Sequence, residues 1–131
     1  MISSKFIFDI LDMLLDGDEA GKALRRQVDY LTDTEYDYTG IGLFVTFQPS
    51  QGILKYKCEE ERIVLDGVSI TSTELGIGAS AIIFATNGVI TTLEIWSYDG
   101  EYPRKELSNY VLKQEGTFGA ACWEMSAGQN G

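Results

Sequence analysis

The apolar residues of this chain change their spacing near residue 40, and this change limits the folds that it can adopt. Before that point they recur at helical spacing, at Ile7, Ile10, Leu11 and Leu14. After it, runs such as IGLFVTFQ alternate with the period of a β-strand. Helices followed by strands are typical of an α+β fold.

The N-terminal part predicts a helical hairpin. Ser3 or Ser4 is expected to cap the first helix, and Gly17 to end it. A second helix is expected from Asp18, with an apolar stripe at Ala20, Leu24, Val28 and Leu31. Residues 32–40, TDTEYDYTG, are interpreted as a polar loop.

The rest of the chain predicts an antiparallel meander of about five or six strands, with the helical hairpin packed on one face. The expected strands are IGLFVTFQ, ILKYK, ERIVL, VSITSTEL, ASAIIFAT and VITTLEIWSY. Asp66–Gly67 and Asn87–Gly88 are expected to form two-residue hairpin turns. A short C-terminal helix is expected within residues 101–113, and the tail from about residue 116 shows no clear period. Residues 1–131 are expected to form one domain.

The Asn87–Gly88 turn predicts which residues share a face of the sheet. An unbroken register pairs Ile82 with Leu93 and places both on the face expected beneath the helices, together with Phe84, Val89 and Ile95. The opposite face then carries Glu94 and Trp96, with Tyr98 beyond them. Glu94 has three interpretations: a solvated residue on a wet sheet face, the charged contact of a binding surface with aromatic anchors, or a catalytic acid that needs a second group.

Charge narrows the classes of partner. The chain has 20 acidic and 10 basic residues and a formal net charge of -10 at pH 7. Nucleic acids and anionic membranes attract basic surfaces, so neither is an expected partner. The excess negative charge suits a basic protein, whose approach it would steer. The acidic candidates for partner binding are Asp33, Glu35, Asp37, Glu59, Glu60, Glu61 and Glu94.

The sequence lacks the residues of the commonest enzyme sites. It has no histidine, which rules out Ser-His and Cys-His dyads, and its two cysteines form no CxxC. The GIG runs lack the third glycine of a dinucleotide fingerprint, and no P-loop occurs. We therefore expect no enzyme activity, metal or cofactor, with catalysis by carboxylates alone as the remaining chemistry.

The N-terminal run MISSKFIFDILDMLLDG has acids within its apolar part and no basic region before it, which does not fit a signal peptide. No later run approaches the ~20 apolar residues of a membrane span. The expected location is the cytoplasm.

From Tyr38 to about Leu112 the chain carries YTGIGLFVTF, a short strand and LDGVSITSTELGIGASAIIFATNGVITTLEIWSYDGEYP. This order resembles a family of small bacterial α+β proteins with a Tyr-Thr-Gly-x-Gly strand start, a Gly-Ala strand, a tight turn and a Leu-Glu strand that ends near an aromatic residue and a proline. Such proteins resemble the immunity proteins of bacterial toxin systems, including contact-dependent growth inhibition. The resemblance implies an inhibitor that binds its toxin in the cytoplasm, in many cases a nuclease with a basic cleft.

Two hypotheses about function follow. The first is an immunity or inhibitor protein that binds a basic toxin domain one-to-one, through the acids named above together with Trp96 and Tyr98. The second is a small-molecule-binding domain with a pocket under the curved sheet, lined by Tyr36, Tyr38 and Trp96. A closed cavity containing Glu94 would favour the second, and a solid core with an open acidic face would favour the first.

Overall fold

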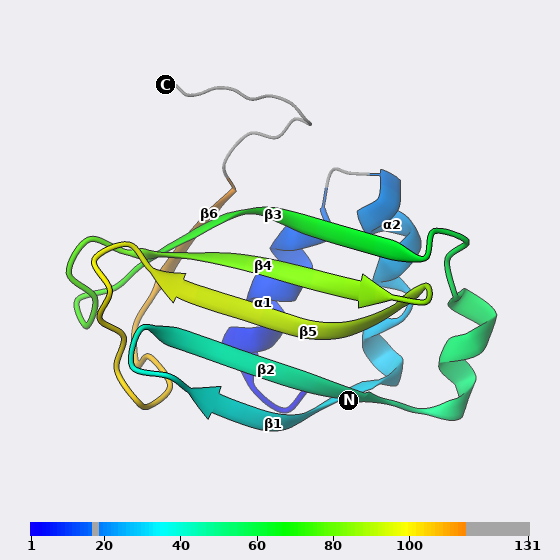
Figure 1. The fold of residues 1–131 in the computed structure, drawn as a ribbon, viewed down its shortest axis with the longest axis horizontal. Helices are drawn as coiled ribbons and strands as arrows, with labels where there is room; N and C mark the ends of the chain where they lie inside the picture. Colours follow the sequence, from blue (N-terminus) through cyan, green and yellow to red (C-terminus); the bar gives the residue numbers. More distant parts are fainter. Residues whose placement is uncertain (17–18, 115–131) are drawn as a thin grey trace.

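A six-stranded antiparallel sheet, with its helices on one face, organises the part of the chain that the computed structural model describes, residues 1–16 and 19–114 (Figure 1). Two α-helices come first, α1 (Lys5–Leu14) and α2 (Glu19–Arg25). The 3₁₀ helices are η1 (Val28–Tyr30) and η2 (Gln51–Tyr56). The strands are β1 (Leu31–Tyr38), β2 (Gly42–Pro49), β3 (Arg62–Thr71), β4 (Ala79–Thr86), β5 (Val89–Ser97) and β6 (Val111–Gln114). The predicted α+β class is confirmed.

Helix α1 forms as the sequence predicts. The Ser4 side chain caps it by accepting a hydrogen bond from the Ile7 N–H at 3.2 Å. Its apolar face is buried, with Phe6, Ile10 and Leu11 almost inaccessible to solvent. Helix α2 ends at Arg25, before the predicted stripe does, and Leu31 begins β1 instead. The predicted residues Gly17 and Asp18 lie outside the described part.

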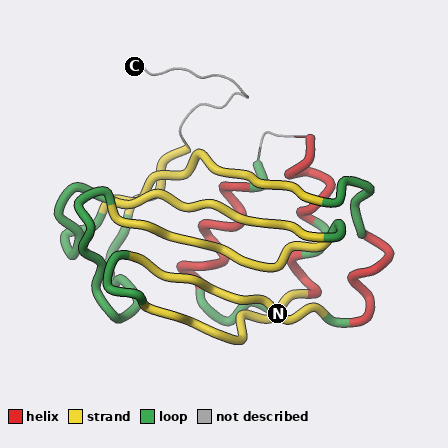
Figure 2. The backbone as a smooth tube through the Cα atoms, in the orientation of Figure 1, coloured by secondary structure: helices red, strands yellow, loops and turns green. Residues whose placement is uncertain are grey.

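The strand order is β1-β2-β5-β4-β3-β6, which differs from the predicted meander because β2 pairs with β5 and not with β3. The 3₁₀ helix η2 carries the chain past the end of the sheet to β3 (Figure 2). This helix replaces the strand predicted for ILKYK. None of the described helices is long and apolar enough to cross a membrane.

The two predicted hairpin turns have different outcomes. Asn87 and Gly88 both adopt positive φ, 54° and 79°, and join β4 to β5 as predicted. Asp66–Gly67 is not a turn: β3 runs through it, and the register shifts between Leu65 and Val68. Gly67 has φ 105° there, so the same glycine chemistry serves a β-bulge within one strand.

The face predicted for β4 is wrong. Ala85 pairs with Ile90, but Phe84 pairs with Thr92, so the register shifts by one residue at Thr91. Because of this bulge, Leu93 and Ile95 are buried as predicted, whereas Ile82 and Phe84 turn to the other side. The buried residues of β4 are Ala79, Ala81, Ile83 and Ala85.

Two further predictions are corrected at the sheet edges. The predicted polar loop of residues 32–40 is mostly the edge strand β1, paired with β2 and bulged at Thr34. The short C-terminal helix predicted within residues 101–113 is absent from that described segment, which is a loop followed by the start of β6. The tail from residue 115 lies outside the described part.

Candidate functional site

The face of the sheet opposite the helices carries most of the predicted binding residues. It faces the viewer in Figure 1, and no described helix lies over it. Residues directly opposite each other on neighbouring strands share a face, so the burial of Leu43, Ile95 and Ala81 puts their chain neighbours on this side. We call it the open face; its side chains include Glu35, Asp37, Phe44, Thr46, Ile82, Phe84, Thr92, Glu94 and Trp96.

One row of side chains crosses four strands of the open face. Asp37 pairs with Phe44, Phe44 pairs with Glu94, and Glu94 pairs with Ile82. With strands ~4.8 Å apart, Asp37 and Glu94 are about 10 Å from each other. The row therefore places an exposed aromatic ring between two carboxylates.

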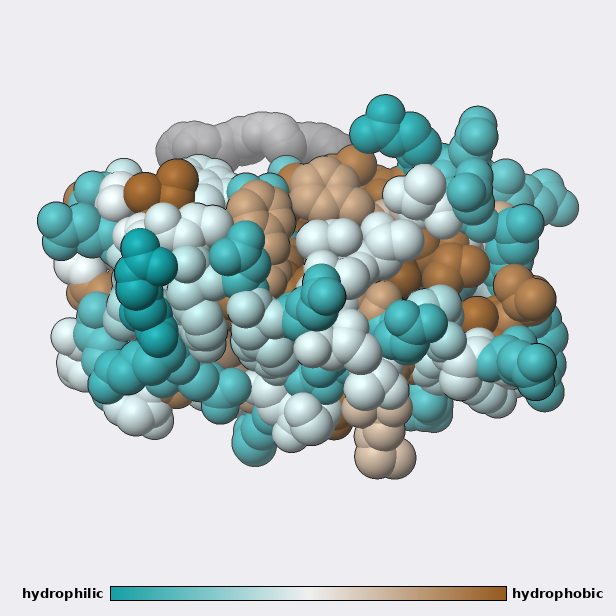
Figure 3. Space-filling view, turned by 60° about the horizontal axis from the view of Figure 1, so that its bottom comes forward, coloured by the Kyte–Doolittle hydropathy of each residue, from teal (hydrophilic) through white to brown (hydrophobic). Residues whose placement is uncertain are grey.

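An aromatic pair lies next to this row at the end of β5. The Trp96 and Tyr98 rings meet edge to face, with centroids 5.2 Å apart at 83°. Their exposed fractions are 42% and 45%. Small residues flank Trp96, which pairs with Gly42 on β2 and with Ser80 on β4. Figure 3 shows the open face obliquely along its upper part, where tan and brown side chains gather between teal ends.

The carboxylates of the open face are not engaged by other side chains of the described part of the chain. Among the described residues, Glu35, Asp37 and Glu94 form neither an ion pair nor a side-chain hydrogen bond. The ion pairs of this part of the chain lie elsewhere and join Lys5 to Asp9, Lys22 to Glu19, Arg25 to Asp12 and Lys105 to Glu74. These three acids are thus free to meet a basic group from another molecule.

Asp33 does not belong to this surface, contrary to the prediction. It is 8% exposed, and its carboxylate accepts hydrogen bonds from the Ser3 N–H at 2.8 Å, the Ser4 N–H at 3.3 Å and the Tyr36 hydroxyl. Desolvation raises the pKa of Asp33, but the hydrogen bonds from Tyr36 and Ser3 outweigh it and leave the pKa below its ordinary value. Asp33 therefore fastens the N-terminal segment to β1.

The predicted acids Glu59, Glu60 and Glu61 are exposed but lie at the other end of the sheet. The Asn87 N–H donates to the Glu61 carbonyl oxygen at 2.6 Å, so this acidic run adjoins the β4–β5 turn. Trp96 is seven residues along β5 from Val89 at that turn, which is about 23 Å at ~3.3 Å per residue. The structure divides the predicted site into two separate regions.

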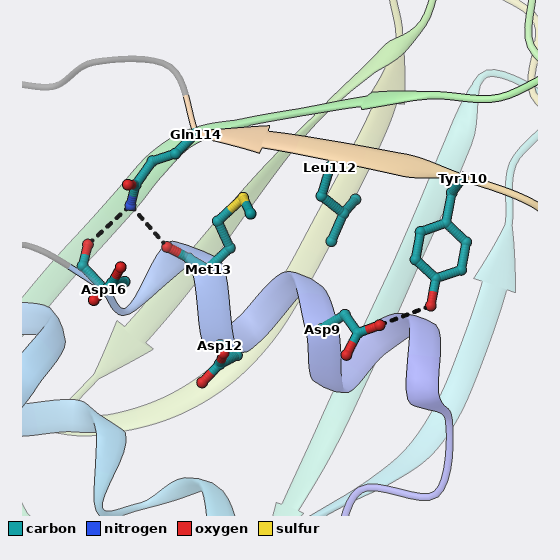
Figure 4. Close-up of a pocket in the computed structure, with 7 residues that line it drawn as sticks. All are labelled: Asp9, Asp12, Met13, Asp16, Tyr110, Leu112 and Gln114. Atoms are coloured by element: carbon teal, nitrogen blue, oxygen red, sulfur yellow. Dashed lines mark hydrogen bonds between the residues drawn. The ribbon is translucent and has the colours of Figure 1, made fainter.

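A groove of about 390 Å³ between α1 and β6 was missed, because residues 101–113 were expected to be helical (Figure 4). The hydrogen bond from Lys5 lowers the pKa of Asp9, which also accepts from the Tyr110 hydroxyl at 2.8 Å. Gln114 Nε2 donates to the carbonyl oxygens of Met13 and Asp16, both at 3.0 Å. The groove is lined by Asp9, Asp12, Met13, Asp16, Tyr110, Leu112 and Gln114. Within residues 1–16 and 19–114, no three acidic or cysteine side chains gather so as to hold a metal ion.

A second groove, of about 460 Å³, lies among the loops at the Tyr98 end of the sheet. Arg104 donates to the Tyr38 carbonyl oxygen at 2.8 Å. The Ser108 N–H donates to Glu74 at 2.7 Å and lowers the pKa of that carboxyl to about 2. Tyr102 contributes to the wall, and its buried hydroxyl has no hydrogen-bond partner among the described residues. The charged groups named here hold loops together.

The proposed pocket beneath the sheet does not form from the residues predicted to line it. Tyr36 and Tyr38 pair with Val45 and Leu43, which are buried on the helix side, whereas Trp96 is on the open face. Glu94 also points to the open face, since its neighbours Leu93 and Ile95 are buried on the other side. The space between α1 and the sheet is filled by apolar side chains.

Comparison of this chain with protein-family models, with curated proteins and with solved structures finds no match.

Proposed function

We propose that this chain is an inhibitor that binds a basic protein one-to-one through the open face of its sheet. The observation that carries the proposal is the row Asp37–Phe44–Glu94 beside the exposed Trp96–Tyr98 pair. Within the described residues, no ion pair engages the carboxylates of this row. Protein interfaces commonly have aromatic residues at the centre and polar groups around them. The open face has this composition.

Net charge supports a basic partner. A chain of charge -10 attracts a positively charged surface over long range and repels most acidic ones. In line with the resemblance to immunity proteins, we propose that the partner is a toxin domain, specifically a nuclease, acting in the cytoplasm. Nuclease clefts are basic because they bind phosphates, and the carboxylates of the open face would take the place of those phosphates. Such inhibition needs no catalytic group in this chain.

Co-expression tests this proposal. The chain is produced together with a toxic nuclease domain of basic net charge, and growth is measured. We expect the unmodified chain to restore growth and Trp96→Ala to lose most of this effect, since truncating an interface anchor costs roughly 2 kcal/mol or more. Phe8→Ala is the matched control, because Phe8 is 44% exposed on the helix side, close to the 42% of Trp96.

Purified proteins give an independent measurement. The association rate of the two proteins is expected to fall as ionic strength rises, because salt screens the attraction between opposite charges. Thermal melts of both variants check that they are folded. If Trp96→Ala is folded and protects as well as Phe8→Ala, the open face is not the binding surface.

A further inference from the structure

We propose that Glu94 and Trp96 together recognise an arginine side chain of the partner. This inference rests on the proposed function, since it assumes that the open face is the binding surface. It adds the chemistry of the group that is bound: a guanidinium placed against the Trp96 indole and paired with the Glu94 carboxylate.

The two residues that pair with Glu94 on the neighbouring strands are both apolar. Phe44 lies directly across from it on β2, Ile82 lies across on β4, and Trp96 is two residues along the same strand and face. Glu94 is half-buried among these side chains and has no hydrogen bond or ion pair within the described residues. A carboxylate partly removed from water interacts with an incoming cation more strongly than a fully solvated one.

No basic residue of the described chain forms an ion pair with Glu94, and Arg104, beside the β1–β2 connection, donates to the Tyr38 carbonyl oxygen instead. Lys113 shares a row with Trp96 through Ser69 and Ser80, three strand spacings or about 14 Å away. Arg62 pairs with Thr86 at the opposite end of the sheet. We therefore assign the cation that would pair with Glu94 to another molecule.

The combination of an indole and a carboxylate favours arginine over lysine. A guanidinium is planar, stacks on an aromatic ring and donates two parallel hydrogen bonds to one carboxylate. An ammonium group is a compact and strongly hydrated charge that does only part of this. Gly42 and Ser80, which pair with Trp96 on the neighbouring strands, are small, and the Tyr98 ring contacts the indole from along the chain. Asp37, beyond Phe44, is the next carboxylate that a second basic group of the partner would meet.

Fluorescence titration tests the preference directly. The chain has two tryptophans, so Trp123→Phe leaves Trp96 as the reporter in the full chain. The probes are blocked hexapeptides of arginine, of lysine and of citrulline, which has the shape of arginine without its charge. We expect arginine to change the Trp96 emission and to bind about fivefold more tightly than lysine, with no binding of citrulline.

A pair of charge-matched variants separates recognition from general attraction. Glu94→Gln and Glu60→Gln each remove one negative charge, but Glu60 is at the far end of the sheet. We expect Glu94→Gln to weaken binding of the arginine peptide at least about fivefold and Glu60→Gln less than about twofold. Equal effects of the two variants, or equal affinity for arginine and lysine peptides, would overturn the inference.

These experiments distinguish failure of arginine recognition from failure of the proposed function. If Trp96→Ala loses growth protection while the arginine peptide shows no preference and Glu94→Gln acts like Glu60→Gln, the open face binds the partner without recognising arginine. If Trp96→Ala and Phe8→Ala protect equally, the proposed function fails, and arginine recognition fails with it.

Discussion

Removing the side chain of Gln27 should destabilise the whole fold, because this residue joins three parts of the chain. It is completely buried. Its Nε2 donates to the carbonyl oxygens of Tyr56, at 3.0 Å, and Gly88, at 2.8 Å. Its Oε1 accepts from the Ile90 N–H at 2.9 Å. Gln27 therefore connects the end of η2 and the β4–β5 turn to the segment that follows α2.

The magnitude follows from these three hydrogen bonds. Each contributes about 1 kcal/mol net to the free energy of unfolding, and a buried group left without a partner costs about 1–3 kcal/mol. Gln27→Ala removes all three bonds and leaves a cavity, so we expect a loss of about 3–5 kcal/mol. The total free energy of unfolding of a domain of this size is typically about 5–15 kcal/mol, so the substitution would remove much of it.

Urea unfolding followed by circular dichroism measures this loss. Gln51→Ala is the control, because Gln51 is exposed at the start of η2, and we expect it to change the free energy of unfolding by less than about 0.5 kcal/mol. Gln27→Glu keeps the length of the side chain but faces the two carbonyl oxygens with a buried carboxylate. A loss below about 1 kcal/mol for Gln27→Ala, close to the control, would refute this account of the fold.

The pH dependence of Gln27→Glu provides a second check with a defined sign. Burial and the two carbonyl oxygens should raise the pKa of the new carboxyl in the folded state. The protonated acid can donate one hydrogen bond. The free energy of unfolding of the variant should therefore be closest to that of the unmodified protein below the unfolded-state pKa of about 4.3, and should decrease relative to it as pH rises. A difference that does not change between pH 4 and pH 7 would contradict this assignment.

Two other perturbations test the elements that frame the open face. Asp33→Asn should lower the free energy of unfolding by about 1–3 kcal/mol at pH 7. Because the folded-state pKa of Asp33 is lowered, this advantage of the unmodified protein should be lost as pH falls below about 4. Urea unfolding at several pH values measures the difference. Gly88→Ala should prevent formation of the β4–β5 turn, because Gly88 has φ 79° and an added Cβ would be 2.2 Å from the Cys58 carbonyl oxygen. Amide hydrogen exchange measures this, and an exchange pattern like that of the unmodified hairpin would contradict the prediction.

The elements predicted correctly from the sequence are those with a strong local cause. Helix α1 has a capping serine and an uninterrupted apolar face, and the β4–β5 turn has the Asn-Gly pair that requires positive φ. The Asp-Gly pair at residue 66 was ambiguous, because a glycine with positive φ suits both a turn and a bulge. Pairing of β3 with β4 along both sides of the bulge decides between them, and this contact is not local.

The open face was identified only in part for a similar reason. Glu94 and Trp96 were placed on the correct side, but Ile82 and Phe84 were assigned to the core. A single bulge at Thr91 reverses the alternation of β5, so a register extended from the turn is wrong beyond that residue. Strand β1 was missed because acids are unfavourable in strands in general, although they are common on edge strands, where they oppose edge-to-edge pairing.

The acids of this chain separate into two groups once their partners are known. Asp9, Asp33 and Glu74 accept hydrogen bonds from residues about 30 to 100 positions away in the sequence, so their negative charge is used in folding. Glu35, Asp37 and Glu94 have no such partner among the described residues, and their mutual repulsion slightly opposes folding. A solvated sheet face needs polar side chains, but it does not need carboxylates on both sides of an exposed aromatic ring. A basic partner would account for both the charge and the aromatic residues, which is why we propose the open face, and not the groove beside α1, as the binding surface.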